Sequence, residues 1–155
     1  MDGPSGGSKS LGRVAGIDYG TVRIGVAISD ADRTIASPLE IYVRRNAALD
    51  AQWFRGLVAD QGVTMFVVGL PIHGDGRESQ KSGEARRFGQ WLGETTGVPV
   101  AFFDERYTSV EAEQFLRGAQ LTNKRRKSRI DMVAAQIILA AYLESQGREH
   151  QPGPL

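Results

Sequence analysis

The strongest constraint on the fold is a change of hydrophobic pattern partway along the chain. Residues 14–18, 24–28 and 34–43 form three closely spaced extended segments, as expected for an antiparallel meander. Beyond them, helical patterns alternate with two further apolar strands at residues 63–70 and 98–103. Strands separated by helices are usually joined by parallel crossovers. The order therefore predicts an α/β protein with one mixed five-stranded sheet, its first part an antiparallel meander and its last two strands parallel, flanked by helices.

Local signals place the helices. Asn46 is a predicted N-cap, and Gly62 marks the end of a first helix that buries Leu49, Trp53 and Leu57. A second helix follows a polar loop at 72–79, and a short third one is expected from Thr108 to about residue 117. The last helix is expected over residues 130–143. Its predicted buried positions recur at helical spacing and are Ile130, Val133, Ala134, Ile137, Ile138 and Ala141.

Length and composition indicate one domain. The chain has 155 residues, a formal charge of +1 and no cysteine, which excludes disulfides and thiolate chemistry. No apolar stretch approaches the roughly 18 residues of a membrane span. We expect a single domain over residues 13–146, disordered tails at 1–12 and 147–155, and a soluble cytoplasmic protein that contacts no membrane.

Three acidic residues lie next to core elements. Asp18 ends the first strand, Glu105 follows the last strand and Asp131 opens the final helix. Each also has a structural explanation, as a turn cap, a partner for Arg106, or a helix cap. Asp104 is an alternative to Glu105 as the ligand at this position, and the sequence spacing does not decide between the two. Because sites gather at the carboxyl ends of parallel strands, convergence of the three acids would form a site for a hard divalent metal.

A dense run of positive charge precedes the last of these acids. A solvated basic loop is the ordinary explanation, whereas a phosphate-binding flap would give salt-sensitive binding to nucleic acid. Paired metal ions activate water and stabilise the leaving oxygen in phosphodiester hydrolysis, so the two features together suggest a metal-dependent nuclease. The basic residues are Lys124, Arg125, Arg126, Lys127 and Arg129.

Four motifs stand in order along the chain: GIDYGTVRIGVAISD at 16–30, VVGLP at 67–71, DERYTS at 104–109 and KSRIDMVAA at 127–135. Together they resemble the motifs of the YqgF/RuvX family, pre-16S rRNA nucleases and Holliday-junction-resolvase-like proteins of the RNase H-like superfamily. The resemblance covers about residues 13–143.

The resemblance implies an RNase H-like sheet and catalytic, metal-binding roles for Asp18, Glu105 and Asp131, with Mg²⁺ or Mn²⁺, as two ions, as cofactor. Arg23 and Arg106 are implied phosphate or substrate contacts. The implied activity is processing of the 5′ end of pre-16S rRNA during ribosome maturation, on structured RNA or a ribosome precursor.

Three alternatives remain open at this stage. The first is a Holliday-junction resolvase acting on branched DNA, but the better-known resolvases carry a fourth acid where this chain has Ala134. The second is a non-catalytic RNA- or DNA-binding module. The third is a nucleotide-binding domain, because DYGT at 18–21 also resembles the phosphate loop of the actin/hexokinase group. Monomer and homodimer are both compatible with the sequence.

Overall fold

The computed structural model of the chain describes residues 10–108 and 123–150, and the side chains of residues 10–108 and 133–146. Its elements are β1 (Arg13–Asp18), β2 (Arg23–Ser29), β3 (Ala36–Val43), α1 (Ala47–Gln61), β4 (Val63–Leu70), α2 (Gln80–Thr96), β5 (Val100–Asp104), η1 (Glu105–Tyr107) and α4 (Asn123–His150).

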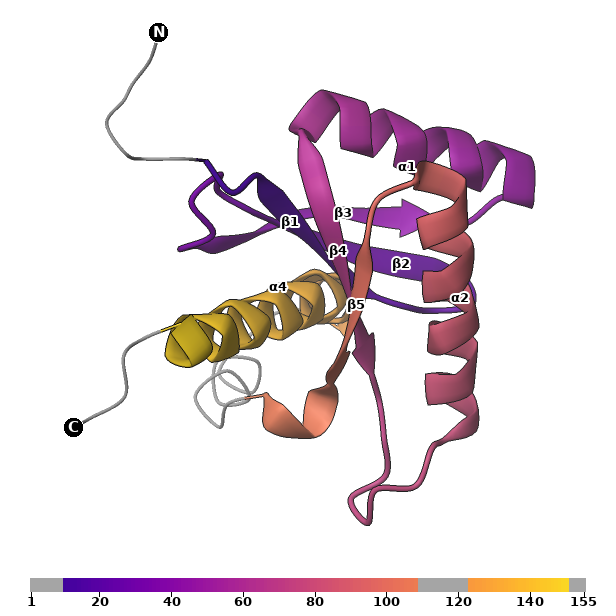
Figure 1. Cartoon of the computed structure of the whole chain (residues 1–155). Coiled ribbons are helices and arrows are strands. Elements are labelled where there is room, and N and C mark those ends of the chain that lie inside the picture. The colour runs from indigo at the N-terminus through magenta and orange to yellow at the C-terminus, as the bar shows by residue number, and fades with distance from the viewer. Residues whose placement is uncertain (1–9, 109–122, 151–155) are drawn as a thin grey trace, which may run out of the picture.

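The five strands form one sheet in the order β3-β2-β1-β4-β5 (Figure 1). β1 pairs with β2 and β2 with β3 antiparallel, whereas β4 is parallel to both β1 and β5. The predicted mixed sheet is therefore confirmed.

Helices cover both faces of the sheet. Helices α1 and α2 lie on one face and α4 crosses the other (Figure 1). Successive residues of β1 alternate between the two cores, since Ile17 packs with Phe54 and Phe88 while Val14 packs with Leu139. This alternation decides which side chains at the end of β1 face α4 and which face α2.

The predicted start and end of α1 are confirmed. Asn46 Oδ1 accepts a hydrogen bond of 2.9 Å from the Leu49 backbone N–H, and Gly62 ends the helix with φ +67°. The predicted buried face is only partly right. Phe54 is fully buried at its centre, whereas Leu49 and Trp53 are partly exposed. Trp53 instead stacks on Tyr42, with ring centroids 4.4 Å apart.

Helix α4 differs most from expectation. It begins at Asn123, so the basic run at 124–129 is helical and does not form a loop. Among its described side chains, those of Val133, Ala135, Ile138, Leu139 and Tyr142 are buried, while Ala134, Ile137 and Ala141 are only partly buried. The reason is close contact with the sheet at Gly16. A Cβ there would lie 2.7 Å from Leu139 Cβ and 3.1 Å from the Ala135 carbonyl oxygen, which directs that side of the helix inward.

Three expectations about the fold fall wholly or partly outside the described residues. The side chain of Ile130 and the short helix at 108–117 lie there, and so do most of the predicted tails. Within the described ranges, no helix combines the length and hydropathy that crossing a bilayer requires.

Candidate active site at the carboxyl edge of the sheet

The parallel strands bring two of the predicted acids to one edge. Asp18 is the last residue of β1, and Glu105 comes directly after β5 as the first residue of η1. Between these strands runs β4, in which Val68 pairs with Ile17 and Gly69 with Phe103. The two carboxylates therefore flank the end of β4, as expected for sites in sheets of this kind.

Gly69 makes room for the Glu105 carboxylate. A Cβ on Gly69 would lie 2.9 Å from Glu105 Oε2 and 2.6 Å from Ile138 Cδ1 of α4. The carboxylate thus lies against the bare backbone of β4, next to the apolar layer that α4 forms. Gly69 was not singled out from the sequence as a site residue. A glycine near the end of an otherwise apolar strand was the signal for such a close approach.

The surroundings of Glu105 make its negative charge costly. Burial raises the pKa of Glu105 to about 7, with the negative charge of Asp18 adding to the shift and that of Asp104 adding less. The positive charge of Lys81 opposes the shift. Lys81 lies in the first turn of α2 and was not singled out from the sequence. Two interacting carboxylates of this kind favour a shared proton or a bound cation.

Asp104 and Glu105 differ in their partners. Asp104 accepts hydrogen bonds from the Arg106 backbone N–H at 2.9 Å and from the Arg106 guanidinium at 2.6 Å, and this partner lowers the pKa of Asp104. Among the described residues, no hydrogen bond reaches the Glu105 carboxylate. The geometry favours Glu105 over Asp104 as a ligand, because the oxygens of Asp104 are already engaged by Arg106.

The two arginines proposed as substrate contacts are both at this edge. Arg23 opens β2, whose antiparallel pairing with β1 places its start where β1 ends. Arg106 pairs with Asp104 and also donates to the Gly74 carbonyl at 3.4 Å, which joins η1 to the loop at 72–79. A phosphate would have to share this arginine with Asp104.

Asp131 lies inside α4, eight residues after its first residue, and its side chain lies outside the described set. A helix that starts at Asn123 leaves no role for Asp131 as an N-terminal cap. The direction of α4 follows from two contacts, Tyr142 Oη at 3.6 Å from Met65 Sδ near the start of β4, and Ile138 beside Gly69 near its end. The N-terminal half of α4 therefore runs toward the carboxyl edge, and residue 131 precedes Ile138 by two helical turns.

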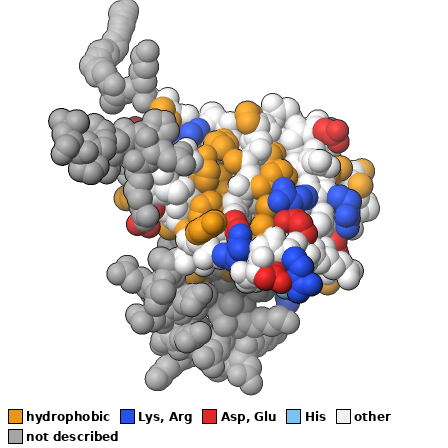
Figure 2. Space-filling view, turned by 60° about the horizontal axis from the view of Figure 1, so that its bottom comes forward, with side chains coloured by type: hydrophobic (Ala, Val, Ile, Leu, Met, Phe, Trp, Pro, Cys, Tyr) orange, Lys and Arg blue, Asp and Glu red, His pale blue; other side chains and the backbone are white. Residues whose placement is uncertain are grey.

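The basic residues precede Asp131 on α4. The side chains of Lys124, Arg125, Arg126, Lys127 and Arg129 also lie outside the described set. Figure 2 turns the carboxyl edge toward the viewer and shows basic and acidic side chains close to one another there. In the loop at 72–79 and in α2, acidic side chains pair with basic ones, as in Arg77–Asp75 at 2.6 Å and Arg86–Glu78 at 2.8 Å. The described part of this face therefore offers no continuous basic surface.

No three histidine or acidic side chains come together as a metal site among residues 10–108 and 133–146. The structure thus brings Asp18 and Glu105 to one edge and places the backbone of Asp131 on the helix that runs toward it. The donors present suit a hard divalent cation, since carboxylate oxygens are the ligands that Mg²⁺ prefers.

Sequence comparison assigns the family. The model of the RuvX family, described as Holliday junction resolvase, matches residues 12–145. A Rhodopirellula baltica protein named "Putative pre-16S rRNA nuclease" is 50% identical over 139 residues, covering 90% of this chain and 80% of that protein. A Rhodobacter capsulatus protein of the same name is 39% identical over 153 residues, with coverage of 97% and 96%.

Solved structures agree on the fold. RuvC of T. thermophilus in complex with a Holliday junction matches with a TM-score of 0.56 at 16% identity, covering 91% of this chain and 99% of that one. A second T. thermophilus RuvC structure gives a TM-score of 0.52 at 15% identity, with coverage of 88% and 96%. The fold is thus the RNase H-like one that RuvC has, and the chain belongs to the RuvX family.

Proposed function

We propose that this protein is a metal-dependent nuclease that hydrolyses phosphodiester bonds, acting on the 5′ end of pre-16S rRNA during ribosome maturation. The observation that supports it best is the pairing of Asp18 and Glu105 at the carboxyl edge, with the Glu105 carboxylate against the bare backbone of Gly69. Such a pair is poorly suited to stand alone as two anions and well suited to hold a cation.

In this proposal Asp18, Glu105 and Asp131 hold Mg²⁺ or Mn²⁺, as two ions. The chemistry that such ions supply is activation of a water molecule and neutralisation of charge on the leaving oxygen. The chain itself contributes rigid placement. β1 holds Asp18, Gly69 admits the Glu105 side chain, and α4 carries Asp131 toward the same edge.

The choice of RNA over DNA rests on the relatives. Proteins 36–50% identical to this chain are named for pre-16S rRNA, whereas the RuvC likeness at 16% identity supports the fold alone. Resolution of four-way DNA junctions is the second candidate, favoured by the description of the matching family.

One side-by-side assay tests the proposal. Precursor 16S rRNA fragments and four-way DNA junctions are incubated with the full chain in Mg²⁺, Mn²⁺ or EDTA. We expect cleavage of the RNA near the mature 5′ end with either metal and none in EDTA, and Asp18→Asn serves as the inactive reference. Cleavage of the junction alone would replace the first candidate by the second. Binding of RNA without cleavage in any metal would indicate a non-catalytic module.

The basic half of α4 gives a separate prediction. Replacing Lys124, Arg125 and Arg126 together by Gln should weaken RNA binding and reduce the steepness with which affinity falls with salt. The log–log slope should become shallower by about 0.7 for each single-strand phosphate that the variant no longer neutralises. Binding is measured in EDTA over a salt range of about 50 to 300 mM.

Arg55→Gln is the control for this triple variant. Arg55 donates to the Thr95 carbonyl at the end of α2 far from the carboxyl edge. Its removal should leave the slope unchanged. An unchanged slope in the triple variant would show that the basic run does not bind phosphates.

A further inference from the structure

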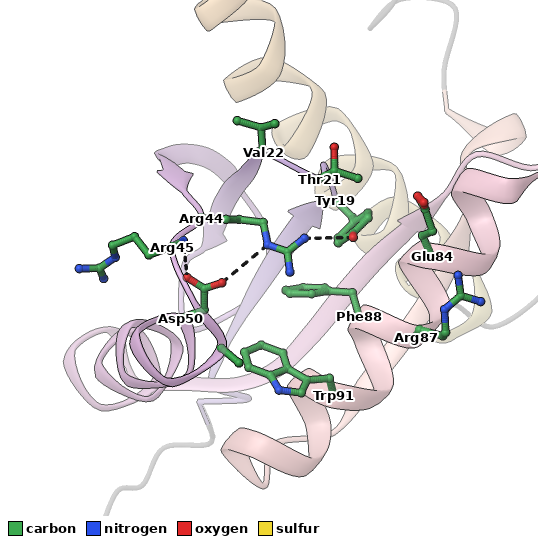
Figure 3. A pocket seen from close by; sticks show the side chains of 11 residues that line it. Tyr19, Thr21, Val22, Arg44, Arg45, Asp50, Glu84, Arg87, Phe88 and Trp91 are labelled. Carbon is green, nitrogen blue, oxygen red and sulfur yellow. Dashed lines mark hydrogen bonds and ion pairs between the residues drawn. The ribbon is translucent and has the colours of Figure 1, made fainter.

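A pocket separate from the Asp18 and Glu105 carboxylates opens at the same edge, on the face of the sheet covered by α1 and α2. Its volume is about 790 Å³, within the roughly 300–1,000 Å³ of small-molecule sites. The turn after β1, the segment between β3 and α1, and α2 all contribute to its wall (Figure 3). The nuclease mechanism proposed above makes no use of it.

Arg44 is the central polar group of this pocket. It donates through Nη1 to Tyr19 Oη at 3.0 Å, and its Nε lies 3.7 Å from Asp50 Oδ2 (Figure 3). Asp50 is itself buried and held by the Tyr42 hydroxyl at 2.6 Å and the Arg45 backbone N–H at 2.9 Å. The contacts with Tyr19 and Asp50 therefore fix the orientation of the guanidinium. Among the described residues, no hydrogen bond uses its Nη2.

Two aromatic rings, those of Tyr19 and Phe88, lie beside the Arg44 guanidinium. The Arg44 guanidinium carbon lies 5.3 Å from the Tyr19 ring centroid and 5.7 Å from that of Phe88. Phe88 is buried, and its ring centroid is 5.5 Å from that of the partly exposed Trp91. The pocket thus presents an oriented guanidinium and, on the other side of the Phe88 ring, a partly exposed indole ring (Figure 3).

A purely structural explanation accounts for only part of this arrangement. Arg44 does link β3 to Asp50 and Tyr19, as an ordinary packing arginine would. Packing does not require an open volume lined by both Trp91 and Arg44, or an Arg44 side chain that remains 29% exposed. A partly exposed aromatic ring and an arginine that line one pocket suit a nucleotide, whose base stacks on the ring while its phosphate pairs with the cation.

We propose that this pocket receives one nucleotide unit, with the base against Trp91 and the phosphate on Arg44. The inference deepens the proposed function and rests on it, since Tyr19 directly follows Asp18 and the pocket borders the same strand end. A strand bound at the carboxylates would reach the pocket by crossing the β1–β2 turn. A free mononucleotide shares this chemistry, and the test separates the two sources.

Two neighbouring alanines provide a matched pair of variants. Ala47 and Ala48 are both exposed in the first turn of α1, but only Ala47 lines the pocket. A glutamate is compatible with the start of a helix, so both variants should fold. Ala47→Glu places a negative charge at the pocket mouth, whereas Ala48→Glu adds the same charge elsewhere.

The probes are a fluorescein-labelled single-stranded RNA of ten nucleotides, AMP and inorganic phosphate, all with the full chain in EDTA. We expect Ala47→Glu to weaken RNA binding by about fivefold or more, as one unscreened repulsion would, and Ala48→Glu to leave it unchanged. Competition by AMP that disappears in Ala47→Glu assigns a free mononucleotide as well. If AMP does not compete but Ala47→Glu still weakens RNA binding, the pocket takes a nucleotide only as part of an RNA strand.

Equal affinities of Ala47→Glu and Ala48→Glu for RNA and for AMP would overturn the inference. Competition by inorganic phosphate as strong as that by AMP would also overturn it, because the base would then contribute nothing. If the protein cleaves RNA but Ala47→Glu leaves its affinity for RNA unchanged, only the pocket proposal is refuted. A protein that binds RNA through the pocket and never cleaves refutes only the nuclease.

Discussion

In the variant Glu105→Gln, we expect cleavage to fall by roughly a thousandfold, the equivalent of about 4 kcal/mol of transition-state stabilisation. The amide keeps the shape of the side chain beside Gly69 but removes the negative charge needed to hold a divalent cation. The measurement is the initial rate on the precursor RNA at saturating Mg²⁺. Glu94→Gln, at an exposed position of α2, is the control and should retain full activity.

The same variant should gain stability when no metal is present. Burial and the charge of Asp18 raise the pKa of Glu105 from an ordinary 4.5 to about 7. Between these values the folded state holds more protons than the unfolded one, so the free energy of unfolding of the wild type falls as the pH rises. Glu105→Gln lacks this titration. It should therefore be the more stable protein at pH 8, by up to about 3 kcal/mol, and comparable to the wild type near pH 4.

Denaturant unfolding in EDTA across this pH range measures the effect. Addition of Mg²⁺ at pH 8 should stabilise the wild type and not the variant, because only the wild type gains a bound ion. If the free energy of unfolding depends on pH in the same way in the two proteins, the pKa of Glu105 is not raised in the folded state. The main physical support for a cation site beside Asp18 would then be lost.

The second large effect is expected for Gly69→Ala. The new methyl group would meet Glu105 Oε2 and Ile138 Cδ1 at less than 3 Å, so both side chains must move. Because both atoms are the ends of flexible side chains, the protein should still fold, at a cost of about 1–3 kcal/mol. Displacing the carboxylate should lower metal affinity and cleavage by roughly 10–100-fold, the size seen when the support of a metal ligand is removed.

Two companion variants separate the site from the core. Gly69→Ala combined with Ile138→Val relieves the clash with the isoleucine and should restore stability without restoring cleavage. Gly16→Ala meets Leu139 Cβ and the Ala135 carbonyl, which cannot move aside, so it should lose stability instead. Full cleavage by Gly69→Ala at native metal affinity would mean that the Glu105 carboxylate does not act from this position.

The sequence was sufficient to predict an element and its bounds where the local signals and the pattern of apolar residues agree. The strand at 63–70 and the helix between Asn46 and Gly62 were predicted with their observed bounds, because cap chemistry and an apolar run coincide there. Pro38 lies in the edge strand β3 beside a register shift, where a residue without an N–H is tolerated. The placement of Asp18 and Glu105 at one edge followed from strand order alone.

The sequence was insufficient to predict features that depend on contacts between residues far apart in the chain. The Ser128-x-x-Asp131 pattern is typical of a helix start, yet α4 begins at Asn123. The inward side of α4 depends on Gly16, more than a hundred residues away. The preference for Glu105 over Asp104 depends on the turn that brings the Arg106 guanidinium onto Asp104, which spacing does not reveal.

The open edge of the sheet also limits how two copies of the chain could assemble. β3 is an outer strand, and its register slips opposite Val26 and Ala27, where Glu40 and Pro38 are successive partners and Leu39 is left over. Pro38 has no N–H to offer, and the slip distorts the row of free amide groups. A neighbouring molecule therefore finds no regular ladder to extend along this border. Symmetric cutting of a four-way junction calls for a twofold pair, and such a pair would have to form through other surfaces.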